Sequence, residues 1–164
     1  MDVRKTQAPI KDRYRTEPEA ALITLRATAD ETSTMTCSVD IGRAVYQAEA
    51  HAGVGGTGGS PCSGDLLLGA LAACAQITCQ MVAAASGVPL QRVRVSVEGN
   101  LDLRGTLGIA RDAAVGFTSI GVRFDIDAPD ATEKQLASLR RATEQYCVVA
   151  QTLLRPPAID FFWR

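Results

Sequence analysis

An almost uncharged segment at residues 64–87, GDLLLGALAACAQITCQMVAAASG, constrains the fold more than any other feature of the chain. Ser63 can accept hydrogen bonds from the first free amides of a helix, and Asp65 lies where the helix dipole favours a carboxylate. Gly87 followed by Pro89 is typical of a helix end. The sequence therefore predicts one helix, roughly 33 Å long at 1.5 Å per residue.

This segment is also close to the ~20 residues that span a bilayer, so a membrane anchor has to be weighed. Gln76, Thr78 and Gln80 interrupt its second half, its immediate flanks carry no Lys, Arg, Trp or Tyr, and much of the remainder is Ala and Gly. Such a composition partitions weakly into lipid. We therefore expect a core helix that is surrounded by protein on all sides. A chain of 164 residues has little other material to cover it, so burial in a homodimer is the simplest expectation.

Three stretches before this helix alternate apolar and polar residues, a pattern typical of half-buried strands. Their apolar positions are Ile23, Leu25 and Ala27, then Met35, Cys37, Val39 and Ile41, and finally Ala44, Tyr46 and Ala48. The sequences ADETS and IGR, at residues 29–33 and 41–43, are expected to be the breaks. Three consecutive antiparallel strands are predicted.

After the helix, RVRVSVEGNLDL alternates around Val93, Val95 and Val97, and a second strand is expected at residues 118–126. Thr132 and Gln135 have the spacing of a capping box that opens a helix. A second short helix is expected after Cys147, before Pro156 and Pro157, and AIDFFW, residues 158–163, is expected to form a closing strand.

The resulting order, βββ-α-ββ-α-α-β, groups strands in runs, which favours an α+β fold with a mainly antiparallel sheet. We predict an N-terminal arm at residues 1–21, extended or with short helical turns, and a single domain at residues 22–164.

Composition excludes several classes of function. The net charge is −1 and no block of like charges occurs, so nucleic acid and membrane surfaces are not expected partners. No apolar leader begins the chain, which favours a cytoplasmic location. Residues 53–58 match G-x-G-x-x-G, but no helix opens at the third glycine and no acidic residue follows at the required distance, so a dinucleotide site is not expected.

The five cysteines are too few and too scattered for a disulfide scaffold, and they contain no C-x-x-C pair. His51 is the only histidine, so no metal site is expected. A cysteine in the middle of a helix, such as Cys74, is more often inert packing than a nucleophile. Cys79 points to a different face of the helix, so only a cysteine brought in by tertiary structure could pair with Cys74.

Two motifs carry a resemblance to a known family. SGDLLLGALAAC, residues 63–74, resembles a segment of the OsmC/Ohr superfamily (osmotically inducible protein C and organic hydroperoxide resistance proteins), in which an acidic residue near a helix start is followed by Leu-Leu, small residues and Ala-Cys. YCVVAQTLL, residues 146–154, is similar to that family's second cysteine segment. The predicted element order is also that of the family, and the resemblance covers about residues 22–163.

The resemblance implies an intertwined homodimer with the long helices at its centre and sites at the subunit interface. It also implies cysteine-based reduction of peroxides, preferentially organic ones. By position, Cys74 would be the thiolate that attacks the peroxide and Cys147 the resolving thiol that condenses with the resulting sulfenic acid. Because Cys147 precedes a predicted helix, that helix start could stabilise its own thiolate.

The family's best-studied members pair a glutamate before the first cysteine with an arginine that holds the thiolate. Here Gly64 stands at that position, and the adjacent Asp65 is the expected substitute. Arg43 is the first candidate for the arginine, with Arg26 and His51 as alternatives.

The leading hypothesis is therefore a cytoplasmic thiol peroxidase without a cofactor, acting as a homodimer on organic hydroperoxides or hydrogen peroxide and regenerated by an external dithiol. A non-catalytic protein that binds a small apolar or electrophilic ligand is the main alternative. Acyl transfer by a nucleophilic Cys74 is a third. Cys62 competes with Cys147 for the resolving role, because the glycine-rich segment could fold back toward the helix.

Overall fold

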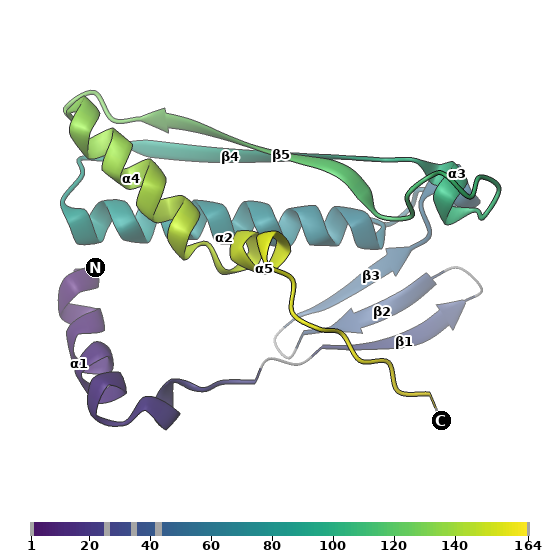
Figure 1. Cartoon of the computed structure of the whole chain (residues 1–164), viewed down its shortest axis with the longest axis horizontal. Helices are drawn as coiled ribbons and strands as arrows, with labels where there is room; N and C mark the ends of the chain where they lie inside the picture. The colour runs from purple at the N-terminus through teal and green to yellow at the C-terminus, as the bar shows by residue number, and fades with distance from the viewer. Residues whose placement is uncertain (1, 25–26, 34–35, 42–43, 164) are drawn as a thin grey trace. The chain divides into compact units, whose positions relative to one another are not determined.

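The structure, a computed structural model, describes residues 2–24, 27–33, 36–41 and 44–163 (Figure 1). The chain forms two compact units, each described by itself below. Unit 1 comprises Met1–Gln7, Ala70–Val97 and Val122–Arg164, and unit 2 comprises Ala8–Gly69 and Glu98–Gly121.

From the first strand to the last helix the elements follow the predicted order, with additions at the N-terminus, before the long helix and between the last two strands, but the predicted closing strand is not found among the described residues. The strands are β1 (Thr28–Ser33), β2 (Thr36–Asp40), β3 (Val45–Glu49), β4 (Arg92–Leu101) and β5 (Phe117–Asp127). The helices are α1 (Val3–Thr16), α2 (Ser63–Ser86), α3 (Leu103–Thr106), α4 (Glu133–Tyr146) and α5 (Val148–Leu154), with 3-10 turns η1 (Pro18–Ala21) and η2 (Ala52–Val54). The predicted α+β class is confirmed.

In unit 2, β1, β2 and β3 form the predicted antiparallel sheet in sequence order. The position predicted for the first strand is wrong, because Leu22 and Ile23 lie before β1, 80% and 76% exposed, and the sequence ADETS lies within the strand. Pairing decides this: the register runs from Thr28↔Asp40 to Ser33↔Thr36. An edge strand such as β1 tolerates polar residues that apolar alternation does not detect.

The glycine-rich connection is organised by Glu49 at the end of β3. Thr57 Oγ1 donates to both carboxylate oxygens, at 3.0 and 3.3 Å. Burial raises the pKa of Glu49, but Thr57 and the amides of residues 58–60 act against it and leave the pKa lowered. The segment that matches G-x-G-x-x-G therefore wraps around a carboxylate of the protein itself, and α2 begins only at Ser63.

Helix α2 has the predicted extent, but its start differs in detail. The first helical bond joins Leu66 N to Cys62 O at 3.1 Å, so Cys62 occupies the capping position predicted for Ser63. Asp65 Oδ2 accepts from Cys62 N at 2.9 Å, which is half of a capping box. At the other end, Gly87 has φ of 68°, and Val88 N bonds to Ala83 O at 2.9 Å, as expected for a glycine helix end.

One stripe of α2 is buried within the chain. Its members are spaced by four residues: Leu71, Ala75, Cys79 and Ala83. In unit 1, Cys79 and Ala83 form a core with Val88, Val93 and Leu139. Leu67, one turn before Leu71 on the same stripe, is 38% exposed in the single chain, and Ile77 and Met81 on another face are 55% and 41% exposed. Within the described residues, α2 is the one helix whose length and composition would suit a bilayer.

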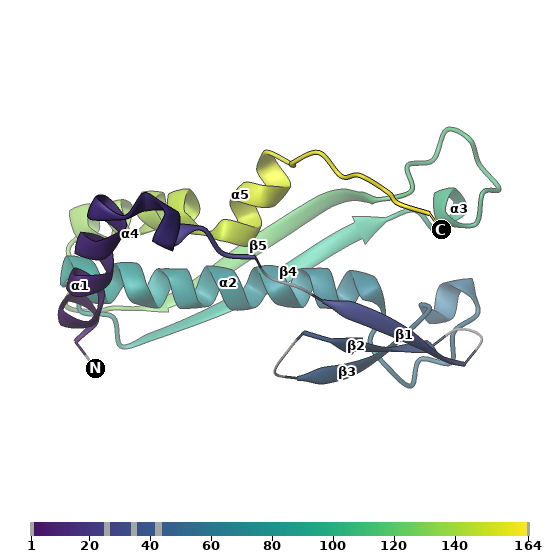
Figure 2. The same cartoon turned by 90° about the horizontal axis from the view of Figure 1, so that it is seen from below.

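Strands β4 and β5 form an antiparallel pair: Gln91 N bonds to Asp127 O at 2.9 Å before β4 begins, and Thr118 Oγ1 bonds to Asn100 O at 3.0 Å near the other end. The capping box predicted for α4 is confirmed, with both Thr132 and Gln135 bonds present. In unit 1, α4 and α5 follow one another along α2 (Figure 1, Figure 2).

The two chain ends differ from prediction. The N-terminal arm contains the 14-residue helix α1, longer than the short turns expected. The closing strand predicted at 158–163 is not formed; Phe161, Phe162 and Trp163 are 75%, 88% and 89% exposed. A strand requires a partner, and no strand in the described part of the chain pairs with this segment.

Candidate functional site

Cys74 and Cys147 are brought together in unit 1 although they lie far apart in the sequence. Cys74 is half-buried near the middle of α2, and Cys147, 2% exposed, lies at the junction between α4 and α5. Each thiol acts on the pKa of the other, so the two side chains are neighbours. Both cysteines are free thiols. A disulfide between them would require their Cα atoms to lie within about 7 Å of each other.

The junction at Cys147 results from the end of one helix meeting the start of the next. Cys147 N bonds to Thr143 O at 3.0 Å and closes α4, while Cys147 O accepts from Gln151 N at 2.8 Å and opens α5. Its backbone is extended, with φ of −71° and ψ of 103°. The following amides, at the start of α5, have no acceptor within their own helix and are free to bind another group.

These amides act on Cys74. Burial raises the pKa of the Cys74 thiol, but hydrogen bonding from the Val149 amide, the Cys147 thiol, the Thr78 hydroxyl and the Val148 amide outweighs burial and leaves the pKa lowered. Hydrogen bonds to a charged form favour that form. The arrangement therefore favours a thiolate at Cys74.

Cys147 has the opposite tendency. Burial is the main cause that raises the pKa of its thiol, and the neighbouring Cys74 raises it further, while the Ala150 and Val149 amides lower it in part. Cys147 thus remains the thiol that donates to Cys74. The start of α5 acts on Cys147 as expected, since the Ala150 and Val149 amides lower the pKa of its thiol, but burial and the neighbouring Cys74 outweigh them and leave that pKa raised.

The cationic partner predicted for Cys74 is not found among the described residues that act on its pKa. Arg43 and Arg26 lie outside the described residues, so their assignment stays a prediction. His51 is described: its Nδ1 accepts from Gly53 N at 3.0 Å and caps η2. The donors found around Cys74 are neutral amides, a hydroxyl and a thiol.

Asp65 acts at the start of α2. The Cys62 amide and then the Cys62 thiol lower the pKa of its carboxyl, burial raises it slightly, and the charge of His51 lowers it. A role of Asp65 toward Cys74, which the resemblance implies, stays a prediction. Cys62, the competing resolving cysteine, is thus hydrogen-bonded to Asp65.

Sequence reasoning missed three groups that act on Cys74: Thr78, Val148 and Val149. Thr78 lies four positions after Cys74 on the same helix face, so helical spacing could have identified it. The two valine amides could not be found from residue type, because any residue at the start of α5 supplies the same N–H group.

The remaining described cysteine, Cys79, is 1% exposed, and burial is the main cause of its raised pKa.

A cavity of about 470 Å³ borders Cys147, with Leu71, Ala75, Val122, Phe124 and Ala150 among its apolar walls. No group of three or more metal-binding side chains occurs within the described residues.

The α+β fold agrees with a comparison against protein families. A family model described as OsmC-like protein matches residues 56–161. The chain belongs to this family.

Solved structures support the same fold. The OsmC-like protein of Mycoplasma pneumoniae has a TM-score of 0.69 at 18% identity, covering 82% of this chain and 89% of that one. The organic hydroperoxide resistance protein OsmC of Legionella pneumophila has a TM-score of 0.60 at 20% identity, covering 83% and 92%. The organic hydroperoxide resistance protein OhrB of Bacillus subtilis has a TM-score of 0.52 at 19% identity, covering 83% of this chain and 94% of that one. No curated protein sequence gives a significant match.

Proposed function

We propose that the protein is a cysteine-based thiol peroxidase that reduces organic hydroperoxides and, as a smaller substrate, hydrogen peroxide. The observation that carries this proposal is the pair of neighbouring thiols, Cys74 and Cys147, whose pKa values are shifted in opposite directions. A peroxidase needs one sulfur that is a nucleophile and a second that remains available as a thiol.

The reaction follows from this division of roles. The Cys74 thiolate attacks the O–O bond of ROOH; a new S–O bond forms, the O–O bond breaks, and the leaving alkoxide takes a proton to become ROH. The Cys147 thiol then attacks the sulfenic acid, forming the Cys74–Cys147 disulfide and releasing water. An external dithiol reduces this disulfide by thiol–disulfide exchange and is itself oxidised to a disulfide.

Two observations favour organic substrates. The cavity beside Cys147 has mainly apolar walls, which suit a hydrocarbon group. The similar proteins of Legionella pneumophila and Bacillus subtilis are named as organic hydroperoxide resistance proteins. We further propose that the protein acts in the cytoplasm as a homodimer, with Asp65 and Arg43 as the charged pair that supports Cys74.

Initial rates of peroxide reduction test the proposal. Tert-butyl hydroperoxide and hydrogen peroxide are each supplied with dithiothreitol as the dithiol. Cys74→Ser is expected to lower the rate at least about a thousandfold, since it removes the nucleophile. Cys147→Ser is expected to permit one turnover and then stop at an oxidised Cys74. Cys62→Ser, which alters a cysteine outside the pair, is the matched control and should retain the wild-type rate.

Peptide mapping after one equivalent of peroxide identifies the resolving cysteine. The expected product links Cys74 to Cys147 and leaves Cys37, Cys62 and Cys79 as free thiols. A disulfide between Cys74 and Cys62 would instead assign the resolving role to Cys62. Peroxide loss that is equal in wild type and Cys74→Ser would contradict the peroxidase altogether.

A non-catalytic binding protein is the second candidate, because the apolar cavity of about 470 Å³ is large enough for a small ligand. This candidate requires no thiolate. It is favoured if Cys74 reacts with iodoacetamide no faster than an ordinary thiol near neutral pH and if both cysteine variants bind the same ligand.

A further inference from the structure

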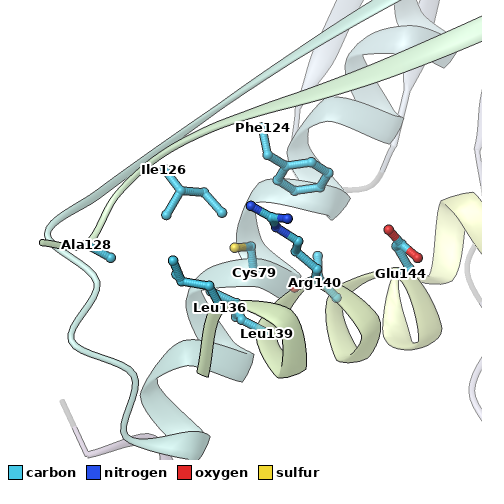
Figure 3. Close-up of a pocket in the computed structure, with 9 residues that line it drawn as sticks. Cys79, Phe124, Ile126, Ala128, Leu136, Leu139, Arg140 and Glu144 are labelled. Atoms are coloured by element: carbon cyan, nitrogen blue, oxygen red, sulfur yellow. The ribbon is translucent and has the colours of Figure 1, made fainter. Parts of the chain in front are cut away.

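A second cavity, of about 370 Å³, lies in unit 1 between β5 and α4 and shares Phe124, Thr143 and Glu144 with the cavity beside Cys147. One part of its wall is apolar, formed by Phe124 and Ile126 from β5, Leu136 and Leu139 from α4, and Cys79 from α2; Arg140, Thr143 and Glu144 form a polar part (Figure 3). Cys74 and Cys147 are not among the residues that line it. Its size is within the range of small-molecule sites.

Arg140 supplies the only positive charge among the residues that line this cavity. Its side chain extends from α4 toward Phe124, so the guanidinium end lies over the apolar walls (Figure 3). Within the described chain, Arg140 makes no hydrogen bond or ion pair. Glu144 also lines the cavity one turn further along α4, and its carboxylate stands apart from the guanidinium in the same view.

We propose that this cavity binds a small apolar carboxylate. A guanidinium presents paired N–H groups that match the two oxygens of a carboxylate, and an unpaired Arg140 has this capacity free. The hydrocarbon part of the ligand packs against Phe124, Ile126 and Leu136. A single cation with Glu144 nearby suits one negative charge better than the two of a phosphate monoester.

Binding at this site is non-covalent and does not require Cys74 or Cys147, neither of which lines the cavity. The one thiol that lines the cavity, Cys79, is 1% exposed and has a raised pKa, so it is a poor nucleophile. The Cys74→Ser protein is therefore expected to bind the ligand as well as the wild type does. This result separates the two proposals, because either can fail alone.

The test uses octanoate as the probe and octan-1-ol as its neutral counterpart, each titrated into the full-length protein by calorimetry. Octanoate is expected to bind one site per chain and more tightly than octan-1-ol. Equal affinity for the two compounds, or no binding of octanoate, would overturn the proposal.

Three variants locate the site. Arg140→Gln is expected to weaken octanoate binding about tenfold. This is the lower end of the range of binding energies for a hydrogen bond to a charged group, because Arg140 is exposed. Arg123→Gln is the matched control: it removes the same charge from β5 at the position before Phe124, which faces the other side of the strand. Glu144→Gln is expected to strengthen binding, since it removes a negative charge near the carboxylate. Equal effects of Arg140→Gln and Arg123→Gln would place octanoate elsewhere.

Discussion

Cys74 owes its lowered pKa to a second helix rather than to its own. A position in the middle of α2 is remote from the favourable N-terminal dipole of that helix. The amides at the start of α5, the Cys147 thiol and the Thr78 hydroxyl supply the donors instead. Peptide dipoles and neutral donors can stabilise a thiolate in the same way as a nearby cation does.

The pH dependence of alkylation tests this account at the level of the residue. A lowered pKa keeps Cys74 a thiolate as the pH falls, so Cys74 should react with iodoacetamide at lower pH than an ordinary thiol. Cys147→Ala and Thr78→Val each remove one donor and should move the alkylation midpoint of Cys74 to higher pH. Mass spectrometry of the Cys74 peptide measures the midpoint. A midpoint that stays unchanged in both variants would contradict the assignment.

At the scale of the element, the start of α2 and the junction between α4 and α5 position the chemistry. Asp65 fixes the first turn of α2 through Cys62 N, at 2.9 Å. The bonds of Cys147 to Thr143 and Gln151 end one helix and begin the next. The same junction thus places a thiol and two free amides at Cys74.

Substitutions of Asp65 separate its cap from its proposed role in the site. Asp65→Ala removes the acceptor of Cys62 N and should lower the free energy of unfolding by about 1 kcal/mol, a usual value for a lost cap. Because its pKa is lowered in the folded state, this stabilisation should be present near neutral pH and be lost as the pH falls through that folded pKa. Urea unfolding at several pH values measures both effects.

Asp65→Asn keeps an acceptor oxygen for Cys62 but removes the charge. If Asp65 supports Cys74 together with Arg43, this variant should lose peroxidase rate while it retains most of the stability. An unchanged rate would restrict Asp65 to capping the helix.

At the scale of the whole molecule, the apolar side chains that the single chain leaves exposed on α2 require an explanation. Leu67, Ile77 and Met81 are all more than a third exposed. Exposed apolar surface of this kind is typical of an interface. A homodimer, which the family resemblance implies, would cover this surface without a membrane.

Light scattering after size exclusion tests the dimer. The wild type is expected at about twice 17.4 kDa without detergent. Ile77→Glu places a charge on the exposed face of α2 and should weaken the dimer at least about tenfold, because a buried unpaired charge costs several kcal/mol. Ser138→Glu adds the same charge on α4 and should leave the mass unchanged. A monomeric wild type would contradict the prediction.

Local chemistry was enough to predict several elements. The uncharged segment with its glycine stop determined α2, and the spacing of Thr132 and Gln135 determined the start of α4, because caps and turns depend on neighbouring residues. The position of β1 was not predictable in this way, since pairing with β2 rather than apolar alternation places it. The closing strand predicted at residues 158–163 fails for the same reason: a strand needs a pairing partner, and none is found among the described strands.

The sequence by itself determined the α+β class, the long helix and the two cysteine segments, since each is encoded in residues near one another in the chain. Only the tertiary structure decided which groups surround Cys74. These are two amides at the start of α5, the thiol of Cys147, which caps α5, and the hydroxyl of Thr78, one turn further along α2. The tertiary structure also decided that Arg140, which has no ion-pair partner among the described residues, lines a cavity with Phe124 and Ile126. Amides carry no residue-specific signal, and the distance between remote side chains is fixed only by packing, so neither could be read from the chain.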